Sequence, residues 1–225
     1  MTTFVLVPGA WHGPSAWDRV VPLLERAGAR TVTPDLAATP ETGLRDHVET
    51  VVAALDAVGE PVVLAGHSYA GLVVRQAADR SPERVGHVAL IDGWAGPDGA
   101  GMFTLAPEAF VSRIRAAADE KGLVPAPAPG AFGIDDPDDA EWLRPRLRPH
   151  PLRTFTDTTT LTGAVDRIPG TALYCRPRTM PFDELAEKVG YRTVPVDGPH
   201  NVMLALPEAV ARFLLDISEV QNREA

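Results

Sequence analysis

The sequence of 225 residues contains a single cysteine, Cys175, so a disulfide within the chain is impossible and the redox compartment stays open. No apolar run approaches the length of a membrane span. The apolar stretch near the N-terminus stops at Pro8, which makes it too short for a secretion signal. We therefore expect a cytoplasmic protein without a membrane segment.

Positive charge is also scarce. The chain has 21 lysines and arginines against 30 aspartates and glutamates, a formal net charge of −9. Such a surface repels nucleic acid and anionic membranes, so neither is an expected partner. No set of histidines, cysteines and acids has the spacing of metal ligands. We expect no metal and no other cofactor.

The sequence does contain a regular alternation of apolar runs and helical patterns. This alternation predicts a six-stranded parallel sheet with helices on both faces, an α/β fold. The predicted strands cover residues 3–7, 30–33, 61–65, 85–91, 171–175 and 191–196. The predicted helices cover residues 15–27, 44–58, the stretch after the third strand to residue 80, 182–189 and 207–218.

The alternation stops between residues 94 and 169, a segment that we call the excursion. It has no recognisable strand, a proline-rich stretch at residues 124–130, and helical patterns at residues 107–120 and 138–147. We predict a single domain over residues 1–225, with the excursion as an insertion that leaves the sheet edge and returns to it.

The stretch VVLAGHSYAGLVV, residues 62–74, places Ser68 in a small-residue turn between a strand and a helix. In such a turn the serine oxygen projects out of the sheet, so Ser68 is a candidate nucleophile. The usual pattern is G-x-S-x-G, but here Ala70 takes the last position and Gly71 comes one residue late. A helix-capping serine is the alternative interpretation.

Two further side chains lie near the carboxyl ends of predicted strands, where open parallel sheets bind ligands. His200 follows the last strand and is a candidate general base for Ser68. Asp92 ends the fourth strand and is the candidate acid that orients His200. Asp183, expected inside the next helix, is the alternative acid. Taken separately, a loop histidine can be merely solvated and Asp92 can be a turn or helix cap.

Backbone N–H groups could complete the site. The N–H of Tyr69 lies at a helix N-terminus, and the glycine-rich loop after the first strand offers a second donor, the N–H of Ala10. For that loop, a plain connection is the alternative. The candidate substrate-pocket residues are Trp11, His12, Trp94, Phe103 and Phe110.

A small basic patch falls inside the excursion. It could meet an acidic carrier protein or a carboxylate substrate, but we expect a solvated face of the excursion. The patch consists of Arg144, Arg146, Arg148 and His150.

The chain resembles the α/β-hydrolase superfamily, and more closely the small bacterial serine hydrolases related to plant methylesterases and hydroxynitrile lyases. The resemblance rests on FVLVPGAWHGPSAWDRVVPLLERAGARTVTPDLAA, on VVLAGHSYAGLVV and on DGPHNVMLALPEAV. It implies an α/β-hydrolase fold in which the excursion is a small helical cap. It also implies Ser68 as nucleophile, His200 as base, and an oxyanion hole formed by Ala10 and Tyr69.

Two departures from the family pattern are informative. The usual acid site, after the fifth strand of this chain, is empty, but some superfamily members carry the acid after the preceding strand, where Asp92 lies. The resembled lyases place a lysine directly after the catalytic histidine, whereas this chain has Asn201. Asn201 therefore counts against a lyase.

These observations predict a serine hydrolase that cleaves a carboxylic ester or thioester of a small molecule through an acyl-enzyme. One alternative is an acyltransferase of natural-product biosynthesis, which would pass the acyl group to a non-water acceptor and could use an acyl-carrier protein. A second alternative is a ligand-binding protein that kept the fold without the chemistry. The substrate and the oligomeric state stay open.

Overall fold

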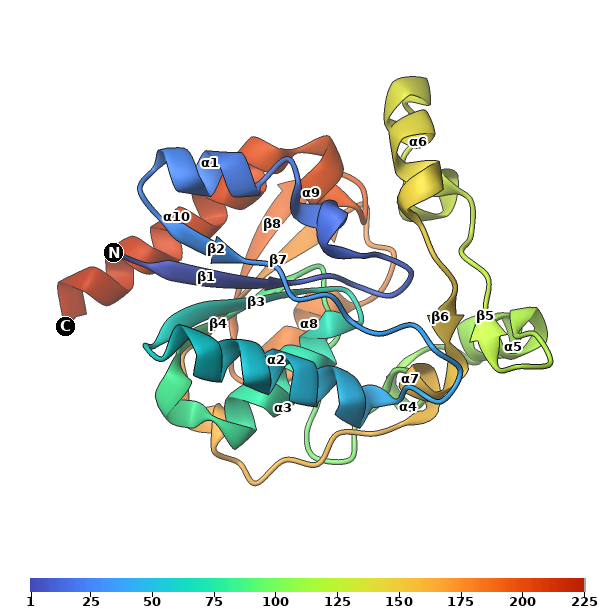
Figure 1. The fold of residues 1–225 in the computed structure, drawn as a ribbon, viewed down its shortest axis with the longest axis horizontal. Coiled ribbons are helices and arrows are strands. Elements are labelled where there is room, and N and C mark those ends of the chain that lie inside the picture. Colours follow the sequence, from blue (N-terminus) through green and yellow to red (C-terminus); the bar gives the residue numbers. More distant parts are fainter. Residues whose placement is uncertain (225) are drawn as a thin grey trace.

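The computed structural model describes residues 1–224. Six strands form one parallel sheet in the order β2-β1-β3-β4-β7-β8 (Figure 1), which confirms the predicted fold class. In this sheet β1 pairs with β3. The strands are β1 (Thr3–Val7), β2 (Arg30–Val32), β3 (Val62–His67), β4 (Val85–Ile91), β7 (Gly170–Arg176) and β8 (Arg192–Asp197).

Helices cover both faces of this sheet. Along β1, Phe4 and Leu6 pack into one apolar core, while Val5 and Val7 pack into the other. Because both faces are covered, the central strands β1 and β3 are buried at every residue and do not alternate apolar with polar residues, whereas the edge strands β2 and β8 are partly exposed. Helices α1 and α10 lie on one face, and α2, α3 and α8 on the other (Figure 1). Their bounds are α1 (Val21–Arg26), α2 (Leu44–Val58), α3 (Ala70–Arg80), α8 (Phe182–Lys188) and α10 (Pro207–Glu224), with the short α9 (Val202–Ala205) before α10.

The helix predicted over residues 15–27 is divided in the structure. A 3-10 turn, η1 (Pro14–Trp17), precedes α1, which begins only at Val21. Pro22 therefore lies in the first turn of α1, where a helix does not need its missing N–H. Trp17 is fully buried against the sheet.

The excursion connects β4 to β7, which are neighbours in the sheet. The prediction that it has no strand was wrong, because two short strands, β5 (Leu123–Val124) and β6 (His150–Pro151), pair antiparallel. Two residues are too few to give a strand pattern. Its helices and 3-10 turns are α4 (Met102–Leu105), α5 (Glu108–Ala117), η3 (Pro129–Phe132), α6 (Pro137–Leu143), η4 (Arg144–Arg146), α7 (Leu152–Thr156) and η5 (Val165–Arg167); η2 (Pro82–Arg84) precedes β4.

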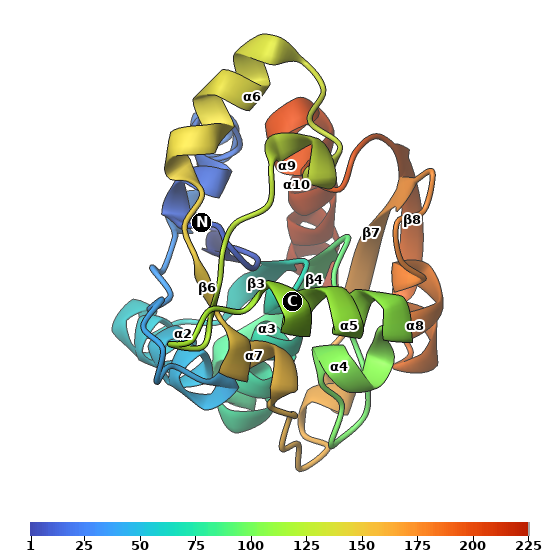
Figure 2. The same cartoon turned by 90° about the vertical axis from the view of Figure 1, so that its right-hand side faces the viewer.

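The excursion lies beyond the carboxyl ends of the central strands, at the right of Figure 1 and facing the viewer in Figure 2. Helix α6 lies at one end of the excursion in both views, and β6 runs from that end toward α7 (Figures 1 and 2). Residues that follow the strands therefore lie between the sheet and the excursion. No helix within residues 1–224 is both long and apolar enough to cross a membrane.

Candidate active site

Ser68 occupies a tight turn between β3 and α3. Its φ of +52° is a left-handed conformation that non-glycine residues rarely adopt. The Ser68 N–H donates to the carbonyl of Ile91 at 3.2 Å, and the Ser68 carbonyl accepts from the N–H of Trp94 at 3.0 Å. The turn is thus fastened to the end of β4 and to the first residue of the excursion.

The glycines beside Ser68 make room for crossing backbones. A Cβ on Gly66 would lie 2.7 Å from the carbonyl oxygen of Ala70, and one on Gly71 would lie 2.2 Å from that of Trp94. Ala70 itself is fully buried and needs no such space. The glycine displaced by one position therefore has a structural reason, because the backbone at Trp94 crosses α3 beside Gly71.

Three of the predicted residues lie in line. The Nε2 atom of His200 is 3.0 Å from Ser68 Oγ, and His200 Nδ1 is 2.6 Å from Asp92 Oδ2. Because an ionised carboxylate can only accept, Nδ1 carries the proton and Nε2 is free to accept one from the serine hydroxyl. This is the relation of nucleophile, base and orienting acid in serine hydrolases.

Asp92 is held as firmly as Ser68. It has a φ of +43°, is 2% exposed, and its Oδ1 accepts the N–H of Cys175 at 2.8 Å. The alternative acid, Asp183, lies on α8 and pairs instead with the guanidinium of Arg178. The structure therefore brings Asp92 to the imidazole and directs Asp183 elsewhere.

Two residues that the sequence analysis did not assign to the site support His200. The His67 Nε2–H donates to the His200 carbonyl at 2.9 Å, and the Phe182 ring stacks on the imidazole at 5.6 Å and 15°. Burial keeps the pKa of His67 well below its usual value, so this side chain is neutral. The only signal for His67 in the sequence is its place before Ser68, and Phe182 has none.

The glycine-rich loop after β1 packs directly on the serine turn. A Cβ on Gly9 would lie 2.8 Å from His67 Nδ1 and 3.0 Å from Ser68 Cβ. Only glycine allows this approach. The loop that carries Ala10 thereby lies against the turn that carries Ser68 and Tyr69.

Backbone strain is concentrated at this edge. Within residues 1–224, the non-glycine residues with positive φ are Trp11, Ser68 and Asp92, which follow β1, β3 and β4. Each such conformation costs about 1–3 kcal/mol and persists only where surrounding contacts enforce it. Strain of this kind is typical of functional sites.

A cavity of about 540 Å³ opens between Ser68, His200 and the excursion. Its lining is mostly apolar and rich in aromatic rings, and Arg113 on α5 contributes a cationic side chain. The aromatic lining residues are Trp11, Trp94, Phe110, Phe132 and Phe182.

Three of the five predicted pocket residues, Trp11, Trp94 and Phe110, line this cavity, and two do not. His12 is 5% exposed and its Nδ1 bonds to the carbonyl of Ala10, within its own loop. Phe103, on α4 of the excursion, stacks on Phe155 at 6.1 Å and packs half-buried against the core. Their place in the sequence did not distinguish a lining ring from a packed one.

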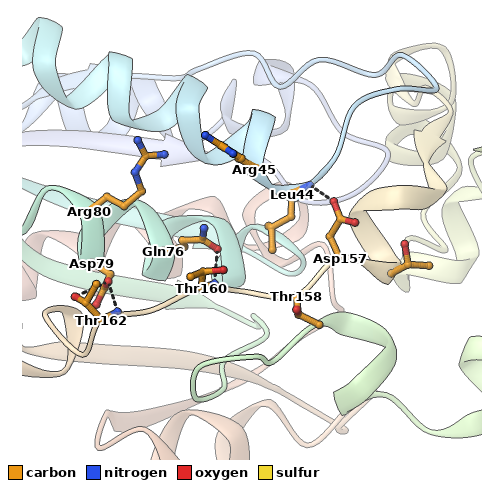
Figure 3. A pocket seen from close by; sticks show the side chains of 10 residues that line it. Leu44, Arg45, Gln76, Asp79, Arg80, Asp157, Thr158, Thr160 and Thr162 are labelled. Carbon is orange, nitrogen blue, oxygen red and sulfur yellow. Dashed lines mark hydrogen bonds between the residues drawn. The ribbon is translucent and has the colours of Figure 1, made fainter.

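A second cavity, of about 840 Å³, is a polar groove between α2, α3 and the returning end of the excursion (Figure 3). Neither Ser68 nor His200 lines it. Asp79 accepts from Thr162 N and Oγ1 at 2.6 and 2.9 Å and from Val165 N at 3.0 Å. Asp157 accepts the Leu44 N–H at 3.0 Å. These bonds attach the excursion to α2 and α3.

The expected solvated basic patch was wrong for two of its members. His150 is 5% exposed and packs among the rings of Tyr69, Phe155 and Trp11. Arg148 Nη2 donates to the carbonyl of Leu36 at 2.7 Å. Both residues therefore join the excursion to the body of the protein. No group of three or more metal-ligating side chains is present within the part of the chain that the structure describes.

Comparison with known proteins identifies the family of this chain. The model of the alpha/beta hydrolase family matches residues 4–213, and the chain belongs to that family. It is 28% identical over 244 residues to the carbendazim hydrolyzing esterase of Nocardioides sp., covering 95% of this chain and 98% of that one. It is 42% identical over 93 residues to the rice esterase PIR7B, covering 36% and 35%. An extracellular α/β-hydrolase from Paenibacillus has the same fold, with a TM-score of 0.87, 20% identity, and coverage of 96% and 98%.

Proposed function

We propose that this α/β-hydrolase is a serine ester hydrolase in which Ser68 is the nucleophile, His200 the general base and Asp92 the orienting acid. The observation that carries the proposal is the chain of contacts from Ser68 Oγ to His200 Nε2 at 3.0 Å and from His200 Nδ1 to Asp92 Oδ2 at 2.6 Å. The esterase names of the similar proteins from Nocardioides and rice support the same reaction class.

The reaction would proceed in two halves. As Ser68 Oγ attacks the ester carbonyl carbon, His200 Nε2 takes the hydroxyl proton, and the imidazolium is stabilised by Asp92. Collapse of the tetrahedral intermediate breaks the ester C–O bond, and His200 gives its proton to the departing alkoxide. A water then attacks the acyl-enzyme with the same base, releasing the acid and restoring the Ser68 hydroxyl.

The N–H groups of Ala10 and Tyr69 would bind the oxyanion. Tyr69 directly follows the nucleophile and precedes α3, so its N–H belongs to the positive end of that helix. The packing of Gly9 on Ser68 supports a second donor from the neighbouring loop. Donors fixed before the reaction stabilise the developing charge without reorganisation.

The substrate would be an apolar, preferably aromatic, ester. A cavity of about 540 Å³ with an aromatic lining suits a small molecule whose acyl or alcohol part is a ring. The Arg113 side chain at this cavity is exposed and could meet a polar or anionic group of the substrate. We propose that the excursion acts as the cap that shapes this pocket.

The other sequence predictions have less support. The similar proteins are esterases, so the acyltransferase alternative is not favoured, and no observation supports an acyl-carrier protein as partner. Cell fractionation would test the cytoplasmic location, and sedimentation would determine the oligomeric state.

The test is an activity screen over p-nitrophenyl, methyl and thioester substrates with a Ser68→Ala variant. Wild type should hydrolyse some of them, and S68A should lose about 10³-fold or more in kcat. The matched control is Ser112→Ala, an exposed serine bonded only to Glu108, which should keep full activity. A fluorophosphonate probe should label wild type and not S68A. Equal activity of wild type and S68A would reject the proposal, and tight ligand binding without labelling would favour a binding protein.

A further inference from the structure

Every hydrogen-bonding group of Trp11 is bonded to the excursion. Its backbone N–H donates to His150 Nδ1 at 3.3 Å, and its indole Nε1–H donates to the Val124 carbonyl at 3.1 Å. Its carbonyl accepts the Arg148 N–H at 3.0 Å. Trp11 has a φ of +65°, and these three bonds oppose its relaxation to an ordinary conformation.

His12 holds the same loop from inside the body. Its Nδ1–H donates to the Ala10 carbonyl at 2.7 Å, and its Nε2 accepts from Asn201 Nδ2 at 2.9 Å. Its backbone N–H donates to the Gly9 carbonyl at 3.2 Å. Asn201 is 1% exposed and directly follows His200, so the loop and the general base share one packed support.

Two successive peptide groups are therefore fixed. The Gly9–Ala10 peptide carries the Ala10 N–H, and its oxygen is bonded to the His12 N–H. The oxygen of the Ala10–Trp11 peptide is bonded to His12, and its N–H to His150. A rotation of the Gly9–Ala10 peptide would turn the Ala10 N–H and break the bond to the His12 N–H. The Ala10–Trp11 peptide shares the Ala10 Cα with it, so the bonds to His12 and His150 restrain the same residue from the other side.

The two histidines use opposite tautomers. His12 must carry its proton on Nδ1 to donate, whereas His150 must leave Nδ1 unprotonated to accept. Burial lowers the pKa of His12 to about 4 and that of His150 well below its usual value, so both rings are neutral near pH 7. The neutral His12 ring uses both nitrogens, one as donor and one as acceptor. The neutral His150 ring uses Nδ1 as acceptor, and its buried Nε2–H has no hydrogen-bond partner among the described residues.

We propose that His12 and His150 are positioning residues that clamp the Ala10–Trp11 peptide, and that the excursion thereby aligns the Ala10 N–H toward the substrate oxyanion. This inference rests on the proposed function. It assigns the excursion a part in catalysis besides lining the pocket. Misalignment of one donor lowers transition-state binding more than substrate binding, so kcat should fall while KM changes little.

The first test compares His150→Phe with His150→Asn. Phenylalanine keeps an aromatic ring in the cluster but removes the acceptor for the Trp11 N–H, whereas asparagine can offer its Oδ1 near the position of Nδ1. H150F should lose about 10- to 100-fold in kcat, with KM within about threefold of wild type. H150N should recover most of that loss. Equal kcat for H150F and wild type would overturn the proposal.

The second test makes the same change from the other side. His12→Phe removes the donor to the Ala10 carbonyl, and His12→Asn can replace it with its amide N–H. We expect the same split between the two variants as at position 150. The control is His87→Phe, since His87 lies on β4 and bonds to Thr171 Oγ1, and it should leave kcat unchanged. Thermal melts confirm that each variant is folded, so that a loss of fold is not read as misalignment.

Amide hydrogen exchange separates this inference from the proposed function. Peptides that cover residues 8–13 should exchange faster in H150F and H12F than in wild type, and not in H150N, whatever the protein catalyses. Unchanged exchange in both phenylalanine variants would reject the clamp. If exchange changes as expected while wild type and S68A are equally inactive, the clamp stands as a structural device but its role at an oxyanion is rejected together with the proposed function.

Discussion

The sheet and the excursion differ in what they bring to the site. Ser68, Asp92 and His200 all follow sheet strands, namely β3, β4 and β8. The excursion contributes pocket lining such as Phe110 and Phe132, and contacts the loop after β1 through His150. In the proposed function, the sheet would therefore set the reaction type, whereas the excursion would shape the pocket and align the loop after β1.

The sharpest test of this comparison is to remove the carboxylate that follows β4. Asp92→Asn should lower kcat by about 10³- to 10⁴-fold, because the amide no longer fixes the imidazole tautomer or stabilises its charged form. Asp183→Asn should leave kcat within about threefold of wild type, because Asp183 pairs with Arg178 rather than His200. Steady-state kinetics on one p-nitrophenyl ester decide between them, and an inactive D183N beside an active D92N would reverse the assignment.

Acidification should lower the free energy of unfolding, and both regions should contribute, because neutral histidines are buried in each. The pKa of His12 is lowered by burial to about 4, and burial also lowers those of His67 and His150. Between about pH 6.5 and 4 the unfolded chain therefore binds more protons than the folded one, so the unfolding free energy falls with decreasing pH. The slope is at most about 1.4 kcal/mol per pH unit for each such histidine, and His12 adds no further loss below about pH 4.

Urea unfolding at pH 7.5, 6 and 5 measures this loss. H150N should show a shallower pH dependence than wild type, because one buried histidine is gone. A free energy that stays constant from pH 7.5 to 5 would contradict the prediction, and two separate transitions would show that the excursion unfolds independently of the sheet.

The excursion contacts the body through His150 at the loop after β1 and through Asp79 on α3. We expect the second contact to affect stability and not kcat. Asp79→Asn weakens the bonds to Thr162 and Val165 at the returning end, and should reduce the unfolding free energy by about 1–3 kcal/mol without changing kcat. Asp56→Asn, at an exposed ion pair, is the control and should cost less than about 1 kcal/mol. A large fall in kcat for folded D79N would mean that this end also aligns the site.

The smallest expected effect concerns the rim of the pocket. Arg113→Ala should raise KM about 3- to 10-fold for an ester that carries a distant carboxylate, and leave a neutral ester of the same length unchanged. Arg115→Ala is the matched control, because its guanidinium lies over Phe103 and not at the cavity. If R113A and R115A affect the charged ester equally, the effect is one of net charge rather than of the pocket.

The sheet was predictable because its information is local. Apolar runs such as those of β1, β3 and β4, separated by helical periods, identify parallel strands, and a parallel sheet gathers the ends of its strands at one edge. Ser68, Asp92 and His200 could therefore be grouped from their positions alone. Their line of contacts, and the choice of Asp92 over Asp183, required coordinates.

The excursion was less predictable because its structure depends on distant contacts. β5 and β6 have two residues each and exist through their mutual pairing. His150 looks like part of a basic surface among arginines, yet it is buried because Trp11, Tyr69 and Phe155 surround it. A local sequence pattern cannot predict the contact between His150 and Trp11, which lie 139 residues apart in the chain.

The one cysteine has a practical consequence. Cys175 is buried, its thiol donates to the Pro199 carbonyl, and burial together with the nearby Asp92 raises its pKa far above the usual value. Alkylating reagents attack thiolates that solvent can reach, so the native protein should be inert to maleimides. A cysteine introduced at the exposed Glu120 of the excursion would then be its only reactive thiol. A single fluorophore at that position could report excursion movement during turnover without a cysteine-free background.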